Sequence, residues 1–345
     1  MSPIRSQKSL DRKLASIHQD PHRPGDFILA DAKDADMAFG LPATGFVWEG
    51  GPGNGRPRTL AEFRDTMRQI VEQGLVDIML MSASTSQELT IDQRIFDHST
   101  VTPAVRANDS TDIHAVRGGH YLASPSLPFR TVTIDQIQSG KAVCTPDERQ
   151  LGADLGLYSV TFNNLAEADR RALEAYREFR LEAEQKGFRH FLEVFNPNLP
   201  DAVPAERLAD FINDHIARML AGVPRAGRPI FLKIPYHGPR AMEALVTYDP
   251  HLVVGILGGS AGTSYDALKM LSEARKYGAR AALFGRKINQ AEDQLAFVEV
   301  LRAVADGQLS AEEGVKRYHA ALEKKGIRPR RSLPDDMVLT QVPLS

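Results

Sequence analysis

The chain is poor in cysteine, and its 345 residues include only Cys144. A single thiol excludes an intrachain disulfide framework and any zinc site built from several cysteines. Cys144 lies in a polar stretch beside Thr145 and Pro146, which is typical of a thiol without a catalytic role. Any chemistry is therefore expected from other side chains.

The sequence also lacks a long apolar run and an excess of charge of either sign. No stretch approaches the roughly 20 apolar residues of a membrane span, and the first residues carry charges without the apolar core of a secretory signal. The formal net charge is -2, whereas nonspecific nucleic-acid binding needs a basic surface. We therefore expect a cytoplasmic protein without a membrane or nucleic-acid partner.

What the chain does have is a regular alternation of apolar runs with helical patterns. Eight runs rich in β-branched residues are apolar throughout, as expected for strands buried on both faces. They begin at Phe27, Val76, Val101, Leu155, His190, Pro229, Leu252 and Arg280. Strands that alternate with helices have to be parallel. Eight such units predict an α/β fold, a single-domain (β/α)₈ TIM barrel.

Helix signals between these runs agree with this fold. The segment after Thr59 begins with a capping residue and ends at Gly74, and Ser310 with Glu313 has the spacing of a capping box. The connection after the third strand is long enough for an elaborated loop. We assign residues 1–325 to the barrel and residues 326–345 to a C-terminal extension.

Functional groups of such barrels come from the carboxyl ends of the strands and the loops that follow. The last two strands end in glycine-rich turns with one arginine: Gly258, Gly259, Ser260, Gly285 and Arg286. Glycines let backbone N–H groups approach an anion, and arginine adds charge-assisted donors. We interpret these turns as a phosphate-binding site, although tight-turn geometry alone also explains glycines. Arg106 and Asn108, after the third strand, are further candidates for substrate binding.

Lys233 lies within the apolar sixth strand, where an isolated charge is unfavourable. It could reach solvent or pair with a carboxylate such as Glu193, at the end of the fifth strand. In a dry barrel mouth near other cations, however, a lysine has a lowered pKa and its neutral amine can attack a carbonyl to form a Schiff base. Glu193 could then move the protons that this chemistry requires.

Four stretches resemble the class I aldolase superfamily, which includes tagatose-bisphosphate, archaeal-type fructose-bisphosphate and deoxyribose-phosphate aldolases. They are "FLEVFNPN", "LKIPY", "GILGG" and "ALFGRKI". The resemblance extends in strand order from Phe27 to Asn289, with tight motifs only after His190. Unlike several relatives, this chain has no second lysine on its fourth strand.

The resemblance implies that Lys233 forms the imine and that Glu193 is catalytic. It assigns an acid–base or hydroxyl-binding role to Asp31, at the end of the first strand, with Asp34 as the alternative candidate. It also implies a small sugar phosphate or related ketone as substrate, no cofactor, and a homo-oligomer.

Three alternatives stay open at this stage. An FMN-dependent barrel oxidoreductase would clamp phosphate with the same turns, and Lys233 would lie beside the flavin. Asp31, Glu193 and His237 could hold a metal for a metal-dependent aldolase, although no close histidine pair supports this. A non-catalytic sugar-phosphate-binding barrel would still bind its ligand after loss of Lys233.

Overall fold

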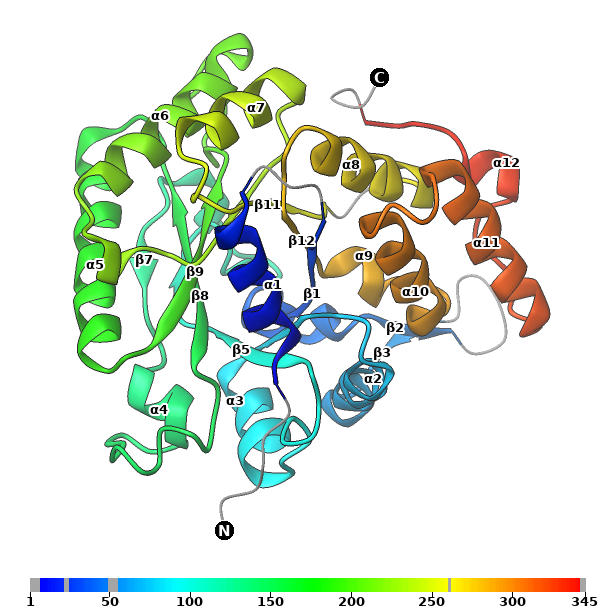
Figure 1. Cartoon of the computed structure of the whole chain (residues 1–345), viewed down its shortest axis with the longest axis horizontal. Coiled ribbons are helices and arrows are strands. Elements are labelled where there is room, and N and C mark those ends of the chain that lie inside the picture. The colour runs from blue at the N-terminus through cyan, green and yellow to red at the C-terminus, as the bar shows by residue number, and fades with distance from the viewer. Residues whose placement is uncertain (1–6, 22–24, 49–54, 260–261, 342–345) are drawn as a thin grey trace.

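A computed structural model describes residues 7–21, 25–48, 55–259 and 262–341. The eight predicted strands form one closed parallel barrel in which neighbours in the chain are neighbours in the sheet (Figure 1). They are β1 (Ile28–Lys33), β4 (Ile78–Met81), β5 (Thr102–Arg106), β8 (Leu155–Thr161), β9 (Arg189–Phe195), β10 (Leu232–Ile234), β11 (Val254–Leu257) and β12 (Ala281–Phe284). The predicted TIM-barrel fold is confirmed.

Helices follow most of the strands and surround the barrel (Figure 1). Those in the first half are α1 (Ser9–Gln19), α2 (Leu60–Gln73), α3 (Ala83–Ser86), α4 (Ile134–Ser139), α5 (Ala166–Gln185) and α6 (Leu208–Ala221). They are followed by α7 (Pro239–Tyr248), α8 (Ser264–Lys276), α9 (Arg286–Asn289), α10 (Gln294–Ala305), α11 (Ala311–Lys324) and α12 (Leu333–Asp336). The predicted caps are present: Thr59 and Ser310 each complete a capping box, and Gly74 ends α2 in the left-handed conformation.

The helix α1 closes the amino-terminal end of the barrel, a role that the sequence did not reveal (Figure 1). Leu10, Leu14 and Ile17 on its apolar face belong to the same buried cluster as the inward side chains of the strands. Lys13 on this helix forms an ion pair with Asp77, with 2.8 Å between Nζ and Oδ2. The side chains of α1 therefore fill the amino-terminal end of the barrel interior.

Side chains along each strand alternate between the inside of the barrel and the surrounding helices. On β1, Ala30 and Ala32 belong to the inner core, whereas Leu29 belongs to the larger core between the barrel and the helices. The same alternation directs Asp31 and Lys33 outward. A residue's position in this period of two therefore decides whether it can reach the barrel mouth.

Two connections at the mouth contain small two-stranded antiparallel sheets. The segment after β1 contains β2 (Phe46–Trp48) and β3 (Gly55–Pro57). The segment after β5 contains β6 (Asp109–Ser110) and β7 (Pro128–Phe129), followed by α4. The predicted elaboration after the third barrel strand is therefore confirmed.

The described part of the tail, residues 326–341, follows α11, contains α12 and returns to α8 (Figure 1). The Thr263 hydroxyl donates to the Val338 carbonyl at 2.8 Å, and the Thr340 N–H donates to Asp266 at 2.8 Å. The tail is thus fastened to the start of α8. The domain boundary at residue 325 stays a prediction.

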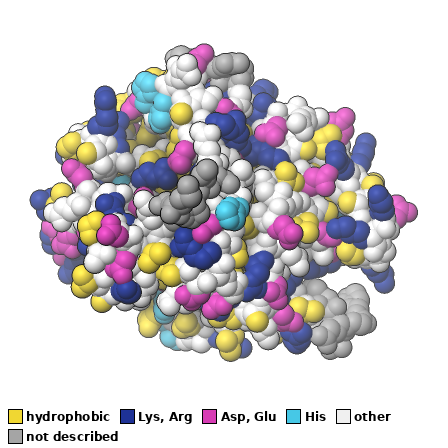
Figure 2. All heavy atoms as spheres, turned by 60° about the horizontal axis from the view of Figure 1, so that its bottom comes forward, with side chains coloured by type: hydrophobic (Ala, Val, Ile, Leu, Met, Phe, Trp, Pro, Cys, Tyr) yellow, Lys and Arg dark blue, Asp and Glu magenta, His cyan; other side chains and the backbone are white. Residues whose placement is uncertain are grey.

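Figure 2 shows positive and negative side chains interspersed over one face of the molecule, with no large field of one sign there. This distribution agrees with the formal net charge of -2. None of the helices in the described ranges combines the length and apolarity needed to cross a bilayer.

Candidate active site

Three neighbouring strands present polar side chains to the inside of the barrel at one level. In the register of the sheet, Ser159 on β8 lies beside Glu193 on β9, and Glu193 lies beside Lys233 on β10. Phe191 and Phe231, two residues earlier on their strands, belong to the inner core. The period of two therefore brings Glu193 and Lys233 together above this apolar floor.

A cavity of about 420 Å³ opens above this row of residues. Lys233 and Glu193 line it, together with Arg106 from β5 and Asp34, which directly follows β1. The loops after the last two strands supply Gly258, Gly259, Gly285 and Arg286. A nucleophile candidate and an anion-site candidate thus share one cavity at the carboxyl end of the barrel, as predicted for this fold.

Four charged groups form a connected network in this cavity. Lys233 Nζ lies 2.5 Å from Glu193 Oε1, and Arg106 Nη2 lies 3.7 Å from Glu193 Oε2. The Arg106 Nε–H donates to Asp34 at 2.6 Å. Two cations and two carboxylates balance, so that the network satisfies the requirement that buried charges be paired.

The electrostatics of the network keep Asp34 ionised. Burial raises the pKa of Asp34, but the neighbouring Arg106 and Lys233 more than offset this effect and hold it below its ordinary value. Burial likewise lowers the pKa of Arg106, and the carboxylates of Asp34, Glu193 and Asp109 more than compensate. Asp34 therefore presents a permanent negative charge close to the Lys233 amine.

Asp31 does not lie where its predicted role requires. It points out of the barrel, its side chain is fully buried, and the carboxylate lies 3.3 Å from Lys33 Nζ. It does not line the cavity, whereas its rival Asp34 does. The reason is the period of two along β1, which directs Asp31 and Asp34 to opposite faces. The acid–base or hydroxyl-binding role of Asp31 stays a prediction, and its placement favours the rival Asp34.

The same placement separates the three residues considered as metal ligands. His237 lies at the mouth with Nε2 2.8 Å from Asn196 Oδ1, but Asp31 lies on the far side of the β1 backbone from Glu193. Within the described ranges, no group of three or more His, Cys, Asp or Glu side chains is arranged to hold a metal ion.

The glycines of the last two turns are required by close packing. A Cβ on Gly258 would lie 2.2 Å from the Phe284 ring, and one on Gly285 would lie 2.5 Å from the Ala32 carbonyl oxygen. The Gly258 N–H is already donated to Leu283, at 2.7 Å. Gly258 therefore contributes space rather than a donor to the cavity.

Arg286 is the cationic group on this side of the cavity. Its guanidinium lies 5.6 Å from the centre of the Phe39 ring, a cation–π distance, and burial lowers the pKa of Arg286. Gly259, with a φ of 61°, brings the backbone of the opposite loop to the same cavity. Ser260, the remaining predicted member of this set, lies outside the described residues.

Asn108 is engaged elsewhere than predicted. Its side chain accepts the Ser159 N–H at 2.7 Å and donates to the Ser159 carbonyl at 2.9 Å. It thereby joins the chain after β5 to β8 and does not line the cavity. The prediction that Asn108 binds substrate is not supported by this placement.

Two functional candidates were missed from the sequence. The Ser159 hydroxyl donates to Glu193 at 2.8 Å and accepts from Arg106 at 3.1 Å, so it joins these two groups. Its inward position could have been inferred by counting in twos from Leu157. Asp112, from the connection after β5, lines the cavity and accepts the Thr161 hydroxyl at 2.8 Å. No local signal marks it.

Comparison with known proteins finds no matching family model and no matching curated protein. Solved structures share the fold. A Schiff-base-forming fructose-1,6-bisphosphate aldolase matches with a TM-score of 0.59 and 16% identity, over 85% of this chain and 99% of that chain. An archaeal fructose 1,6-bisphosphate aldolase gives a TM-score of 0.58 at 16% identity, over 86% of this chain and 99% of the other.

A fructose-bisphosphate aldolase from Slackia heliotrinireducens matches with a TM-score of 0.63 and 12% identity, over 90% of this chain and 91% of that one. At these identities the likeness establishes the fold alone. The predicted resemblance to class I aldolases is thus confirmed at the level of the barrel.

Proposed function

We propose that this protein is a class I, Schiff-base-forming aldolase that cleaves or forms a carbon–carbon bond in a phosphorylated or otherwise anionic sugar-derived ketone. The observation that carries the proposal is the contact between Lys233 and Glu193 inside a cavity that Arg286 also lines. The aldolases that share the fold support the same reading. The homo-oligomer and the cytoplasmic location stay predictions.

The reaction begins with a proton transfer from the Lys233 ammonium to the Glu193 carboxylate, which lies 2.5 Å away. The freed amine attacks the substrate carbonyl carbon, and the proton that the attacking nitrogen loses passes to the carbonyl oxygen to give a neutral carbinolamine. Glu193 then donates its proton to this hydroxyl, which leaves as water. The product is a positively charged iminium on Lys233.

The iminium withdraws electrons from the neighbouring carbon–carbon bond. Glu193, again a carboxylate, accepts the proton of the substrate hydroxyl, the bond breaks, and its electron pair forms an enamine on Lys233 as an aldehyde leaves. Protonation of the enamine and hydrolysis of the resulting iminium release the second product. Aldol formation follows the same steps in reverse.

Asp34 has a different task from Glu193. Because its pKa is held low, it is a poor proton carrier but a constant negative charge near Lys233, which stabilises the iminium cation. Arg106 forms ion pairs with both carboxylates and so helps to hold each of them in position. Gly259 and Arg286 would hold the substrate's anionic group at the other side of the cavity.

Borohydride trapping tests this proposal. The protein is incubated with dihydroxyacetone phosphate or a panel of ketose phosphates, reduced, digested and examined by peptide mass. We expect a reduced adduct on Lys233 that is lost in Lys233→Met. Lys33→Met is the matched control, because Lys33 is also a buried lysine beside a carboxylate, and it should retain the adduct.

Absence of an adduct on every lysine, with all ketose phosphates tested, would overturn the proposal. If no adduct forms, while ketose phosphates bind wild type and Lys233→Met with equal affinity and Arg286→Gln weakens that binding, the protein is a non-catalytic sugar-phosphate-binding barrel.

A further inference from the structure

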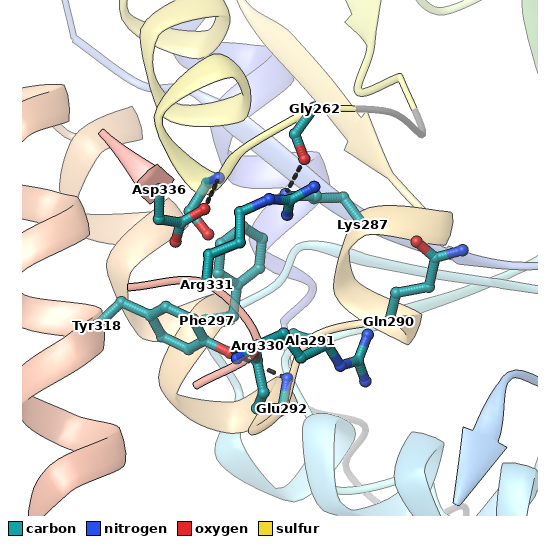
Figure 3. Close-up of a pocket in the computed structure, with 11 residues that line it drawn as sticks. Gly262, Lys287, Gln290, Ala291, Glu292, Phe297, Tyr318, Arg330, Arg331 and Asp336 are labelled. Carbon is teal, nitrogen blue, oxygen red and sulfur yellow. Dashed lines mark hydrogen bonds between the residues drawn. The ribbon is translucent and has the colours of Figure 1, made fainter. Parts of the chain in front are cut away.

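A second cavity, of about 550 Å³, lies outside the barrel where the C-terminal segment passes the residues after β12 (Figure 3). Phe297 of α10 and Tyr318 of α11 form an apolar part of its wall, and Arg330 and Arg331 come from the tail. It is larger than the catalytic cavity of about 420 Å³, and among the residues that the structure describes none lines both. It is therefore a separate compartment.

Three cationic side chains line this cavity: Lys287, Arg330 and Arg331. In Figure 3 the Arg331 side chain reaches toward Lys287 and Gly262, whereas Arg330 extends toward the side of Gln290. Each arginine offers a planar fork of donors, which suits phosphate oxygens. The cations therefore approach the cavity from two directions.

The two carboxylates of the lining are already occupied by protein donors. Glu292 accepts the Tyr318 hydroxyl at 2.8 Å. Asp336 accepts the Ser264 N–H at 2.7 Å and lies 3.0 Å from His319 Nε2. These bonds fasten α8, α11 and the tail around the cavity. The two carboxylates hold the wall in place, and the three cations exceed them by one positive charge among the described lining residues.

Lys287 is the most enclosed of the three cations. Burial lowers the pKa of Lys287, and the Arg331 charge acts in the same direction. The carboxylate of Asp336, with smaller effects from Asp266 and Glu292, only partly opposes this lowering. Its Nζ donates to the Gly262 carbonyl at 3.1 Å, and among the described residues neither Lys287 nor Arg331 forms an ion pair with a carboxylate. An anion that binds between them would not have to displace a carboxylate. It would also offset the repulsion between the two positive charges.

We propose that this cavity is a binding site for a small phosphorylated molecule, whose phosphate lies between Lys287 and Arg331. A phosphate monoester carries a charge of about -1.5 to -2 at neutral pH, which matches two cations without carboxylate partners. The remainder of the ligand extends over the Phe297 and Tyr318 rings toward Arg330 and Gln290. The site does not rest on the aldolase proposal, because its residues are distinct from those of the catalytic cavity.

Calorimetric titration of the full-length protein with inorganic phosphate tests the site. We expect Arg331→Glu and the double variant Lys287→Gln/Arg331→Gln to weaken phosphate binding at one class of site by about tenfold or more, because each removes charge-assisted bonds. Arg331 is exposed, so the single variant should fold even if the double variant does not. The unfolding temperature and circular dichroism of each variant check this.

Two controls locate the bound phosphate. Lys324→Gln/Arg328→Gln removes the same charge from exposed positions nearby that do not line the cavity, and binding should be unchanged. Arg286→Gln should affect only phosphate held in the catalytic cavity. Binding that Arg331→Glu leaves at the wild-type affinity would overturn this proposal, and so would binding abolished by Arg286→Gln alone. Neither result bears on borohydride trapping at Lys233, so the two proposals fail separately.

Discussion

Two buried lysine–carboxylate pairs lie on opposite sides of the same barrel wall. Lys233 and Glu193 face the inside, with exposed side-chain fractions of 8% and 2% and 2.5 Å between Nζ and Oε1. Lys33 and Asp31 face the helices, with exposed fractions of 0% and 0% and 3.3 Å between Nζ and Oδ2. The inner pair lines the cavity of about 420 Å³, and the outer pair does not line that cavity.

The difference teaches that burial alone does not make an active site. Burial raises the pKa of Asp31 to about 6, and the positive charge of Lys33 only partly opposes it. Such a shift is often taken as a sign of function. Here the carboxylate does not line the cavity, and the Lys33 ammonium donates a hydrogen bond to the side-chain oxygen of Gln294 of α10 at 2.8 Å. The outer pair therefore belongs to the packing between barrel and helices.

Replacing each carboxylate by the corresponding amide should give the largest difference in activity between the two pairs. Glu193→Gln removes the proton carrier, and we expect activity to fall on the order of 10³-fold. Asp31→Asn should leave activity nearly unchanged. Steady-state kinetics with a substrate that traps on Lys233 measures both. Equal losses in the two variants would show that the outer pair takes part in catalysis and would break the comparison.

The outer pair should instead appear in the pH dependence of stability. The Asp31 carboxyl has a pKa of about 6 when folded and 3.8 as its ordinary value, so between these pH values the folded state binds more protons than the unfolded state. The free energy of unfolding should therefore fall as pH rises from about 4 to 6, by about 3 kcal/mol in total.

Urea unfolding at a series of pH values, for wild type and Asp31→Asn, tests this expectation. The variant lacks the titrating carboxyl and should lose this part of the slope. Parallel curves for the two proteins would contradict it.

The smallest expected effects concern the uncharged side chain that hydrogen-bonds to each pair, Ser159 for the inner pair and Gln294 for the outer pair. Ser159→Ala removes the hydroxyl between Glu193 and Arg106, and we expect activity to fall by about tenfold, as for one lost bond to a charged group. Gln294→Ala removes the acceptor of Lys33 and should lower the free energy of unfolding by about 1–3 kcal/mol without changing activity. Reduced activity in Gln294→Ala, together with unchanged activity in Ser159→Ala, would contradict the assignment of catalysis to the inner pair.

Much of the fold could be predicted because its signals are local. Each barrel strand is a short apolar run between helix signals, and caps such as Thr59 and Ser310 depend on residues three positions apart. The helix α1 was missed because its apolar face becomes meaningful only against the end of a closed barrel.

The candidate site was predicted in part: Lys233, Glu193, Arg106 and Arg286 line one cavity, whereas Asp31 and Asn108 do not.

The sequence by itself determined the order of the strands, the lysine in the sixth and the glutamate in the fifth. Only the tertiary structure decided between Asp31 and Asp34, because the choice depends on which face of β1 closes against the other strands. It also decided that Arg330 and Arg331 of the tail meet Lys287 at one cavity. Local patterns report how a segment folds, whereas the groups that share a cavity come from segments far apart in the chain.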